Sequence, residues 1–99
     1  MRRYTTPTHR FTLQVAPELI SKIRITYSQD DKIILKKETE QIAIEGNVAI
    51  VKLTQEETAL FVANKEVEIQ IAVRTFGEDA LRSDIIRESV ERVLDNEVI

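Results

Sequence analysis

Residues 66–73 read EVEIQIAV, and this strict alternation decides the class of fold. Apolar side chains at every second position lie on one face of an extended chain, because successive side chains of a β-strand point to opposite sides. Similar alternation recurs at 10–15 and 22–27. We expect these three segments to be half-buried strands, each with one face against a core and the other in water.

The composition agrees with a sheet protein. Ile, Val and Thr account for 31 of the 99 residues, and their branched side chains pack well on a pleated sheet and lose rotamer freedom in helices. The hydrophobic fraction of 42% is enough to build a core, which excludes a disordered chain. Without repeats or linkers, the sequence predicts one β-sandwich domain over 9–99, preceded by an extended N-terminal arm over 1–8.

Turn and cap signals divide the rest of the chain. Gly46-Asn47 suits a tight hairpin, because both residues tolerate positive φ, and it separates strands at 42–45 and 48–53. A further strand is expected at 32–37, although its consecutive apolar residues do not define its faces. Thr54 begins a capping-box pattern that predicts one short crossing helix at about 55–63.

Short strands at intervals of eight to twelve residues favour an all-β, immunoglobulin-like antiparallel β-sandwich of about seven strands. The helix would carry the chain from one sheet to the other. The Cys and Trp residues of antibody cores are absent, so the inference concerns architecture only. The apolar faces predict a core made of Phe11, Ile25, Ile50, Leu60, Phe61, Ile69, Ile71 and Val73.

Several classes of partner and location are disfavoured. With no Cys there is no disulfide framework, which suits a reducing cytoplasm or a large assembly. No apolar run approaches the roughly 20 residues that span a bilayer, and the start of the chain lacks the apolar stretch of a signal peptide. The net charge of −3 argues against a nucleic-acid partner, which would need a basic face.

No residue pattern indicates catalysis, a metal or a cofactor. His9 is the only histidine and is interpreted as a solvated residue at the end of a strand. Asp30-Asp31 lacks the spaced oxygen ligands of a calcium loop and is interpreted as a turn. Ser83-Asp84 has no histidine nearby in the sequence. We therefore expect a protein that is not an enzyme, with no catalytic, cofactor-binding or metal-binding residues.

Basic residues cluster on two neighbouring predicted strands, and the positions are Lys22, Arg24, Lys32, Lys36 and Lys37. They could form a small basic patch. Acidic residues at Glu38 and Glu40 favour cross-strand ion pairs instead.

Several short stretches, taken together and in this order, resemble a known group of proteins. They are Arg3-Tyr4-Thr5-Thr6-Pro7-Thr8, Ile25-Thr26-Tyr27-Ser28-Gln29, Leu53-Thr54-Gln55-Glu56-Glu57-Thr58 followed by Phe61, Ile69-Gln70-Ile71, Ser83-Asp84-Ile85 and Glu97-Val98-Ile99. The chain resembles small proteins encoded by prophages of Gram-positive gut bacteria. Its layout is similar to the immunoglobulin-like N-terminal domain of siphophage baseplate upper proteins.

The resemblance implies a non-enzymatic phage structural or assembly protein of the tail, the baseplate or another part of the virion. Such a protein would be cytoplasmic on synthesis in the bacterial host and would bind other phage structural proteins or itself. The candidate partner-binding segment is the arm, with Tyr4, Thr5, Thr6, Pro7 and Thr8. Pro7 keeps it extended, and eight residues reach at most about 26–29 Å, enough to cross onto a neighbour.

The alternative function is a small ligand- or carbohydrate-binding module of the β-sandwich type. Carbohydrate sites usually present aromatic platforms. The aromatic residues here are Tyr4, Phe11, Tyr27, Phe61 and Phe76. Of these, Phe11, Tyr27 and Phe61 are expected to face the core.

The C-terminal region admits two interpretations. Its apolar spacing over 80–95 is helical, which would leave a six-stranded sheet system with a C-terminal helix. In the proteins that the chain resembles, the matching region looks like the last strand. We therefore expect a strand over about 81–90, followed by a short helical turn at 91–95.

Overall fold

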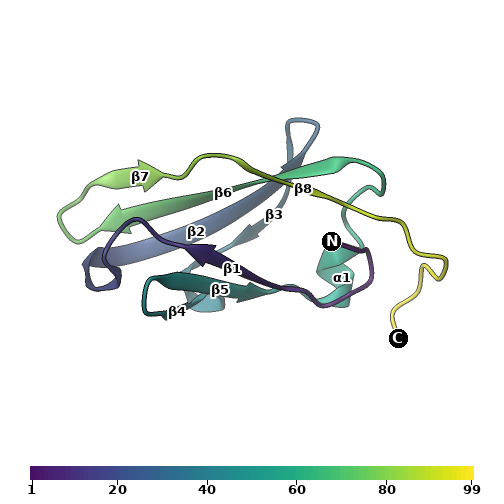
Figure 1. Cartoon of the computed structure of the whole chain (residues 1–99), viewed down its shortest axis with the longest axis horizontal. Helices are drawn as coiled ribbons and strands as arrows, with labels where there is room; N and C mark the ends of the chain where they lie inside the picture. Colours follow the sequence, from purple (N-terminus) through teal and green to yellow (C-terminus); the bar gives the residue numbers. More distant parts are fainter.

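The computed structural model describes residues 1–99 and shows two antiparallel sheets packed as a sandwich, with one short α-helix (Figure 1). The smaller sheet has the order β1 (Thr8–Thr12), β5 (Val48–Lys52) and β4 (Ala43–Glu45). The larger sheet has the order β3 (Lys32–Lys37), β2 (Ile20–Gln29), β6 (Glu66–Thr75) and β7 (Ala80–Arg82), and β8 (Ile86–Ser89) also pairs with β6. The expected β-sandwich is confirmed.

The central pair of the larger sheet is β2 and β6, each ten residues long. Their register places Ile25 opposite Ile71 and Tyr27 opposite Ile69. These side chains share the inner face, because directly opposed residues in an antiparallel pair point the same way. The alternation that predicted both strands therefore also fixes their register, since a slip of one residue would turn the apolar face to water.

The hairpin forms as predicted, and the crossing helix begins where it was expected but ends earlier. Gly46 has a φ of 57° in the two-residue turn between β4 and β5, a conformation that glycine adopts without strain. The α1 helix (Gln55–Thr58) is shorter than the predicted 55–63 and links β5 of the smaller sheet to β6 of the larger one. Two short 3-10 turns, η1 (Pro17–Leu19) and η2 (Thr39–Gln41), complete the connections. None of the helices is long and apolar enough to cross a membrane.

The N-terminal cap of α1 gives a first testable prediction. The Glu57 backbone N–H donates to the Thr54 hydroxyl at 3.1 Å, and the Thr54 N–H donates to the Glu57 carboxylate at 2.9 Å. We expect Thr54→Ala to lower the free energy of unfolding by about 1 kcal/mol in a urea titration, because a backbone donor loses its acceptor. Thr54→Ser keeps the hydroxyl and should be nearly neutral. Equal losses in the two variants would show that the methyl group matters and the cap does not.

The C-terminal region forms strands, and the helical alternative for 80–95 is wrong. The expected strand at 81–90 is present as two pieces, β7 and β8, so the sandwich has eight strands. Between β7 and β8, the regular strand pairing with β6 is interrupted at Ser83. There the Ile71 N–H donates to the Ser83 hydroxyl, and the Ser83 N–H donates to the Ile71 carbonyl. The expected helical turn at 91–95 is also absent. Pairing with the edge of β6 outweighs the local helical spacing.

Five of the eight predicted core residues are buried, and they are Ile25, Phe61, Ile69, Ile71 and Val73. Leu60 is 57% exposed, which corrects its assignment to the core. Phe11 and Ile50 are only half-buried. On β5 the buried side chains are Ala49 and Val51, so Ile50 lies on the outer face. The run of apolar residues at 48–51 does not reveal which face is inside.

Candidate functional site

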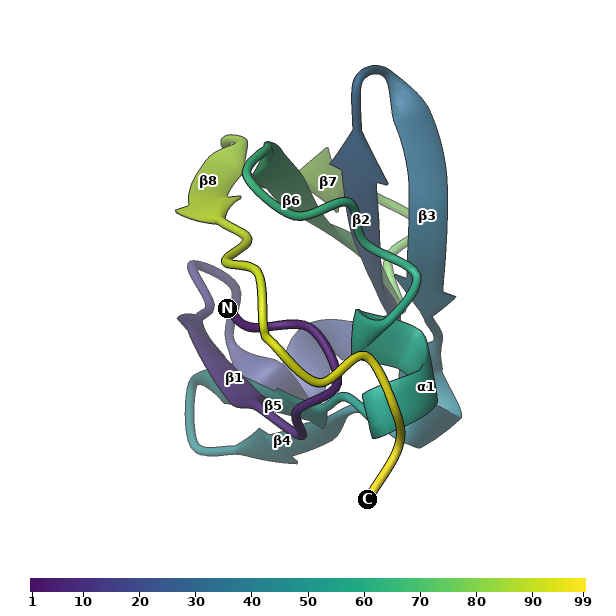
Figure 2. The same ribbon diagram turned by 90° about the vertical axis from the view of Figure 1, so that its right-hand side faces the viewer.

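The N-terminal segment lies against its own domain, which differs from the expected separate arm. Arg2 forms a parallel bridge with Glu91, and the Glu91 N–H donates to the Met1 carbonyl at 2.8 Å. The Met1 side chain packs on the core. The start of the chain therefore lies beside the end of β8 and closes that side of the sandwich (Figure 2).

The middle of the segment is held by α1 and by the end of β5. The Thr5 N–H donates to the Thr58 hydroxyl at 3.0 Å, and that hydroxyl lies 2.9 Å from the Thr5 carbonyl. The Leu53 N–H donates to the Pro7 carbonyl at 3.0 Å. Tyr4 has a φ of 58°, so the chain turns there and is not uniformly extended. Thr6 and Thr8 are exposed, and Tyr4, Thr5 and Pro7 are half-buried.

A polar cluster, which the sequence did not reveal, lies between β1, β2 and β8. His9 Nδ1 lies 2.8 Å from the Tyr27 hydroxyl, and His9 Nε2 lies 3.5 Å from a Glu88 carboxylate oxygen. The amino group of Met1 lies 3.2 Å from the other oxygen of Glu88 and donates to the Ser89 carbonyl. A neutral His9 with its proton on Nε2 accepts the Tyr27 hydroxyl hydrogen at Nδ1. Its Nε2 is buried and has no hydrogen-bond partner, since the Glu88 carboxylate lies too far away and approaches it only through charge.

Burial sets the protonation of this cluster. It lowers the pKa of His9 below its ordinary value, against the opposing effect of the Glu88 carboxylate. Burial also raises the pKa of the Tyr27 hydroxyl well above its ordinary range, helped by Glu88 and Glu57. Both groups are therefore neutral at pH 7, which fits a hydrogen-bonded cluster that ties β1 to β2. His9 is thus half-buried and held by Tyr27, which corrects its assignment as solvated.

The other candidate residues considered in the sequence analysis do not come together as a catalytic or ligand-binding group. Asp30 and Asp31 have positive φ values and form the turn between β2 and β3, as expected. No three His, Cys, Asp or Glu side chains come together in a way that could hold a metal ion. Ser83 forms the hydrogen bonds of the irregular pairing with β6 that follows β7.

The basic residues of β2 and β3 separate into different environments. Arg24 pairs with Glu38, as expected, with its Nε 2.9 Å from a carboxylate oxygen. Lys37 instead points into the sandwich and pairs with Glu57 at 2.7 Å. Its side chain is only 7% exposed, a burial that a lysine tolerates when it is paired. Lys22, by contrast, remains exposed on the outer face of the larger sheet.

An exposed apolar tip is formed by Leu19 and Phe76, which come from η1 and from the turn between β6 and β7. The Phe76 N–H donates to the Leu19 carbonyl at 3.0 Å, so the two turns are joined. Phe76 is 72% exposed and Leu19 is 53% exposed. The turn between β6 and β7 and the beginning of β2, which follows η1, lie at the end of the molecule opposite the chain termini (Figure 1).

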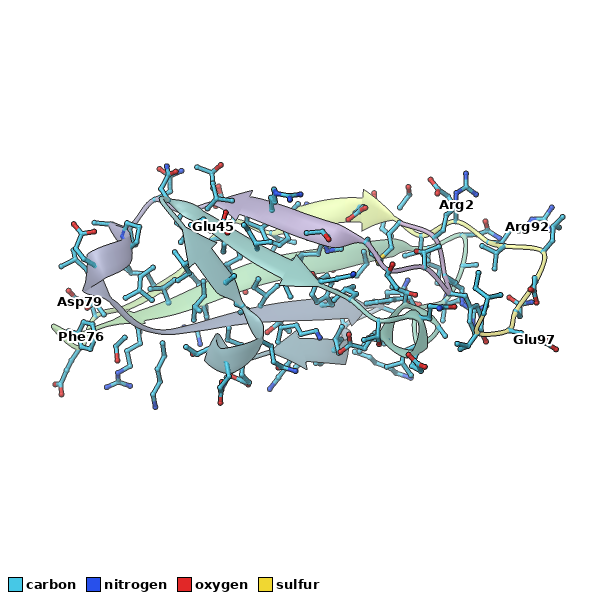
Figure 3. The ribbon with its side chains drawn as sticks, turned by 90° about the horizontal axis from the view of Figure 1, so that it is seen from below. Arg2, Glu45, Phe76, Asp79, Arg92 and Glu97 are labelled. Atoms are coloured by element: carbon cyan, nitrogen blue, oxygen red, sulfur yellow. The ribbon has the colours of Figure 1, made fainter.

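The turn that carries Phe76 is closed by its own hydrogen bonds. The Thr75 N–H donates to the Asp79 carbonyl at 2.9 Å, and the Asp79 N–H donates to the Thr75 hydroxyl at 3.1 Å. Glu78 adopts a φ of 67° within it. Phe76 and Asp79 both project at this end of the molecule (Figure 3). The phenyl ring is thus exposed on an ordered turn.

Comparisons with known proteins give one similar solved structure and no related sequence. No family model matches the chain, and no curated protein sequence matches it. Among solved structures, the V domain of amphioxus IgVJ-C2 is similar: the match covers 94% of this chain and 97% of that one, at 9% sequence identity and a TM-score of 0.40. At this level of similarity nothing about function follows.

Proposed function

We propose that this chain is a non-enzymatic assembly module that acts through protein–protein contact at the tip formed by Leu19 and Phe76. The observation that carries the proposal is the exposure of Phe76 on a hydrogen-bonded turn. A large apolar ring in water contributes nothing to folding, whereas aromatic anchors contribute strongly to binding. Because the turn is already ordered, little conformational entropy is lost when the ring is buried by a partner.

The exposed charges in the two turns of the tip indicate which charge the surface of the partner carries. Glu18, Glu78 and Asp79 are exposed in the same two turns. A complementary surface has an apolar pocket that accepts the Phe76 ring and a rim of Lys or Arg. The partner is therefore expected to be a protein with a basic-rimmed apolar pocket.

The proposed setting is a phage particle. It is supported by the resemblance of the short sequence stretches to prophage-encoded proteins. In this setting the chain is a structural or assembly component of the tail, the baseplate or another part of the virion. It is made in the bacterial cytoplasm and binds other phage structural proteins or itself.

The segment at residues 1–8 is a weaker candidate for the contact. Its backbone groups at Thr5 and Pro7 already have partners within the domain. Releasing the segment would break these hydrogen bonds, whereas Phe76 can be covered without breaking any. The alternative of a carbohydrate-binding module is also weaker, because Phe76 is the only strongly exposed aromatic side chain.

The proposal is tested by measuring binding to each protein encoded beside this one, together with the mass of the chain at increasing concentration. A Phe76→Ser variant should bind its partner about 30-fold more weakly, the effect of losing an anchor of about 2 kcal/mol. Leu94→Ser is the matched control, because Leu94 is 90% exposed in the C-terminal tail, and it should bind as the wild type does. The proposal fails if Phe76→Ser binds normally, or if the chain stays monomeric and binds none of these proteins.

A further inference from the structure

The outer face of the larger sheet contains a cationic hollow, which the proposed tip contact does not use. It has a volume of about 290 Å³, and Ala72 and Ala80 are among the residues that line it. Four basic residues surround these alanines, and they are Lys22, Arg24, Arg74 and Arg82. Glu38 is the only acidic residue in the lining.

Strand pairing brings the positive charges close together. Lys22 lies directly opposite Arg74 in the pairing of β2 with β6. Arg24 and Arg82 lie on either side of Ala72, in β2 and β7. Like charges directly opposite one another destabilise a sheet. The small Ala72 side chain leaves open space between the two guanidinium groups.

At the opposite end of the same face, the basic side chain has acidic partners. There Arg87 of β8 lies opposite Glu68 of β6, and the two side chains are paired at 3.3 Å. Glu66 lies 4.0 Å from the same arginine. The chain as a whole has more acidic than basic residues, with a net charge of −3. The chain as a whole has no excess of basic residues, so an overall excess does not explain the uncompensated positive charge in the hollow.

Most of the donors in the hollow are free. Lys22, Arg74 and Arg82 form no ion pair in the structure. Glu38 contacts Arg24 only at Nε, at 2.9 and 3.1 Å, so both terminal nitrogens of that guanidinium have no partner. Arginine presents its N–H groups in a planar fork that matches phosphate and sulfate oxygens.

We propose that this hollow binds an oxyanion of the phosphate or sulfate class. The anion sits over Ala72, contacts the guanidinium groups of Arg24 and Arg82, and neutralises the repulsion between Lys22 and Arg74. The size of the hollow suits one or two such groups, either as a free ion or as a substituent of a polymer. This inference stands independently of the contact proposed at the tip.

Thermal unfolding at constant ionic strength tests the proposal, with pyrophosphate as the free ion, dextran sulfate as the polymer-borne anion and uncharged dextran as the control. Binding to the folded state alone should raise the Tm of the wild type by about 5 °C or more at saturating anion. A response to pyrophosphate identifies a free ion, and a response to dextran sulfate alone identifies a polymer-borne group. Either response supports the site.

Variants separate a built site from general charge attraction. Arg74→Gln and Lys22→Gln should each have a higher Tm than the wild type without anion, because the repulsion is relieved, and each should lose most of the response to anion. Arg10→Gln is the matched control, because Arg10 is exposed on the smaller sheet and forms no ion pair, and its response should be unchanged. The proposal is overturned if the wild type does not respond, or if Arg74→Gln and Lys22→Gln respond as strongly as Arg10→Gln.

Discussion

Phe61→Ala is expected to lower the free energy of unfolding by about 3–5 kcal/mol, a loss at the upper end of the range for truncating a buried side chain. The Phe61 side chain is 1% exposed and packs edge-on against Tyr27, with ring centroids 5.8 Å apart. Truncation removes the buried ring and leaves a cavity between α1 and β2. Urea unfolding followed by circular dichroism measures the loss.

The neighbouring residue supplies the control. Leu60 is 57% exposed, so Leu60→Ala should change the free energy of unfolding by less than about 0.5 kcal/mol. The sequence alone predicted both residues in the core, and only the structure separates them. Similar losses in the two variants would mean that the chain after α1 does not turn Phe61 inward and Leu60 outward.

The second large effect is expected at the ion pair inside the sandwich. Glu57→Gln leaves the Lys37 ammonium without its counter-charge, while the amide can still accept the hydrogen bond from the Thr54 N–H. Removing one partner of a fully buried pair costs about 3–5 kcal/mol. We expect a smaller loss of about 2–3 kcal/mol, because the Glu57 side chain remains 20% exposed.

A double-mutant cycle isolates the pair. Lys37→Met keeps most of the length of the side chain and removes the charge, so the Lys37→Met/Glu57→Gln double variant should be close to the wild type in stability. If the losses of the two single variants simply added, the two charges would not be interacting.

The same pair predicts how stability depends on pH. Burial alone would raise the pKa of the Glu57 carboxyl, but the hydrogen bonds from Lys37 and from the Thr54 backbone hold it below its ordinary value. The unfolded chain therefore binds this proton more readily than the folded chain does. The stabilisation is complete above the ordinary pKa of 4.5 and is lost as the pH falls through the lowered value. Glu57→Gln should remove this part of the acid dependence.

Local signals were sufficient for much of the fold. The alternation at 66–73 predicts β6, because a strand with one wet face has a period of two. Gly46 marks the hairpin and Thr54 marks the helix start, since each supplies a backbone geometry or a hydrogen bond that the turn or helix requires. These features depend on residues close together in the chain, and each was predicted correctly.

Features that depend on distant parts of the chain were missed. Lys37 is buried because Glu57, twenty positions away, meets it inside the sandwich. The segment at residues 1–8 packs against its own domain because it forms hydrogen bonds with Thr58 and Glu91. No sequence pattern within 1–8 predicts either of these partners. The sequence places His9 at the surface, because its contacts with Tyr27 and Glu88 arise only when three strands come together.

The most direct test of the proposed function is amide hydrogen exchange of the chain with and without its bound partner protein. Contact at the tip should slow exchange at residues 16–20 and 75–79, where the turns of Leu19 and Phe76 are joined, and leave residues 1–8 unchanged. Slowed exchange confined to residues 1–8, with the two turns unaffected, would contradict binding through the tip.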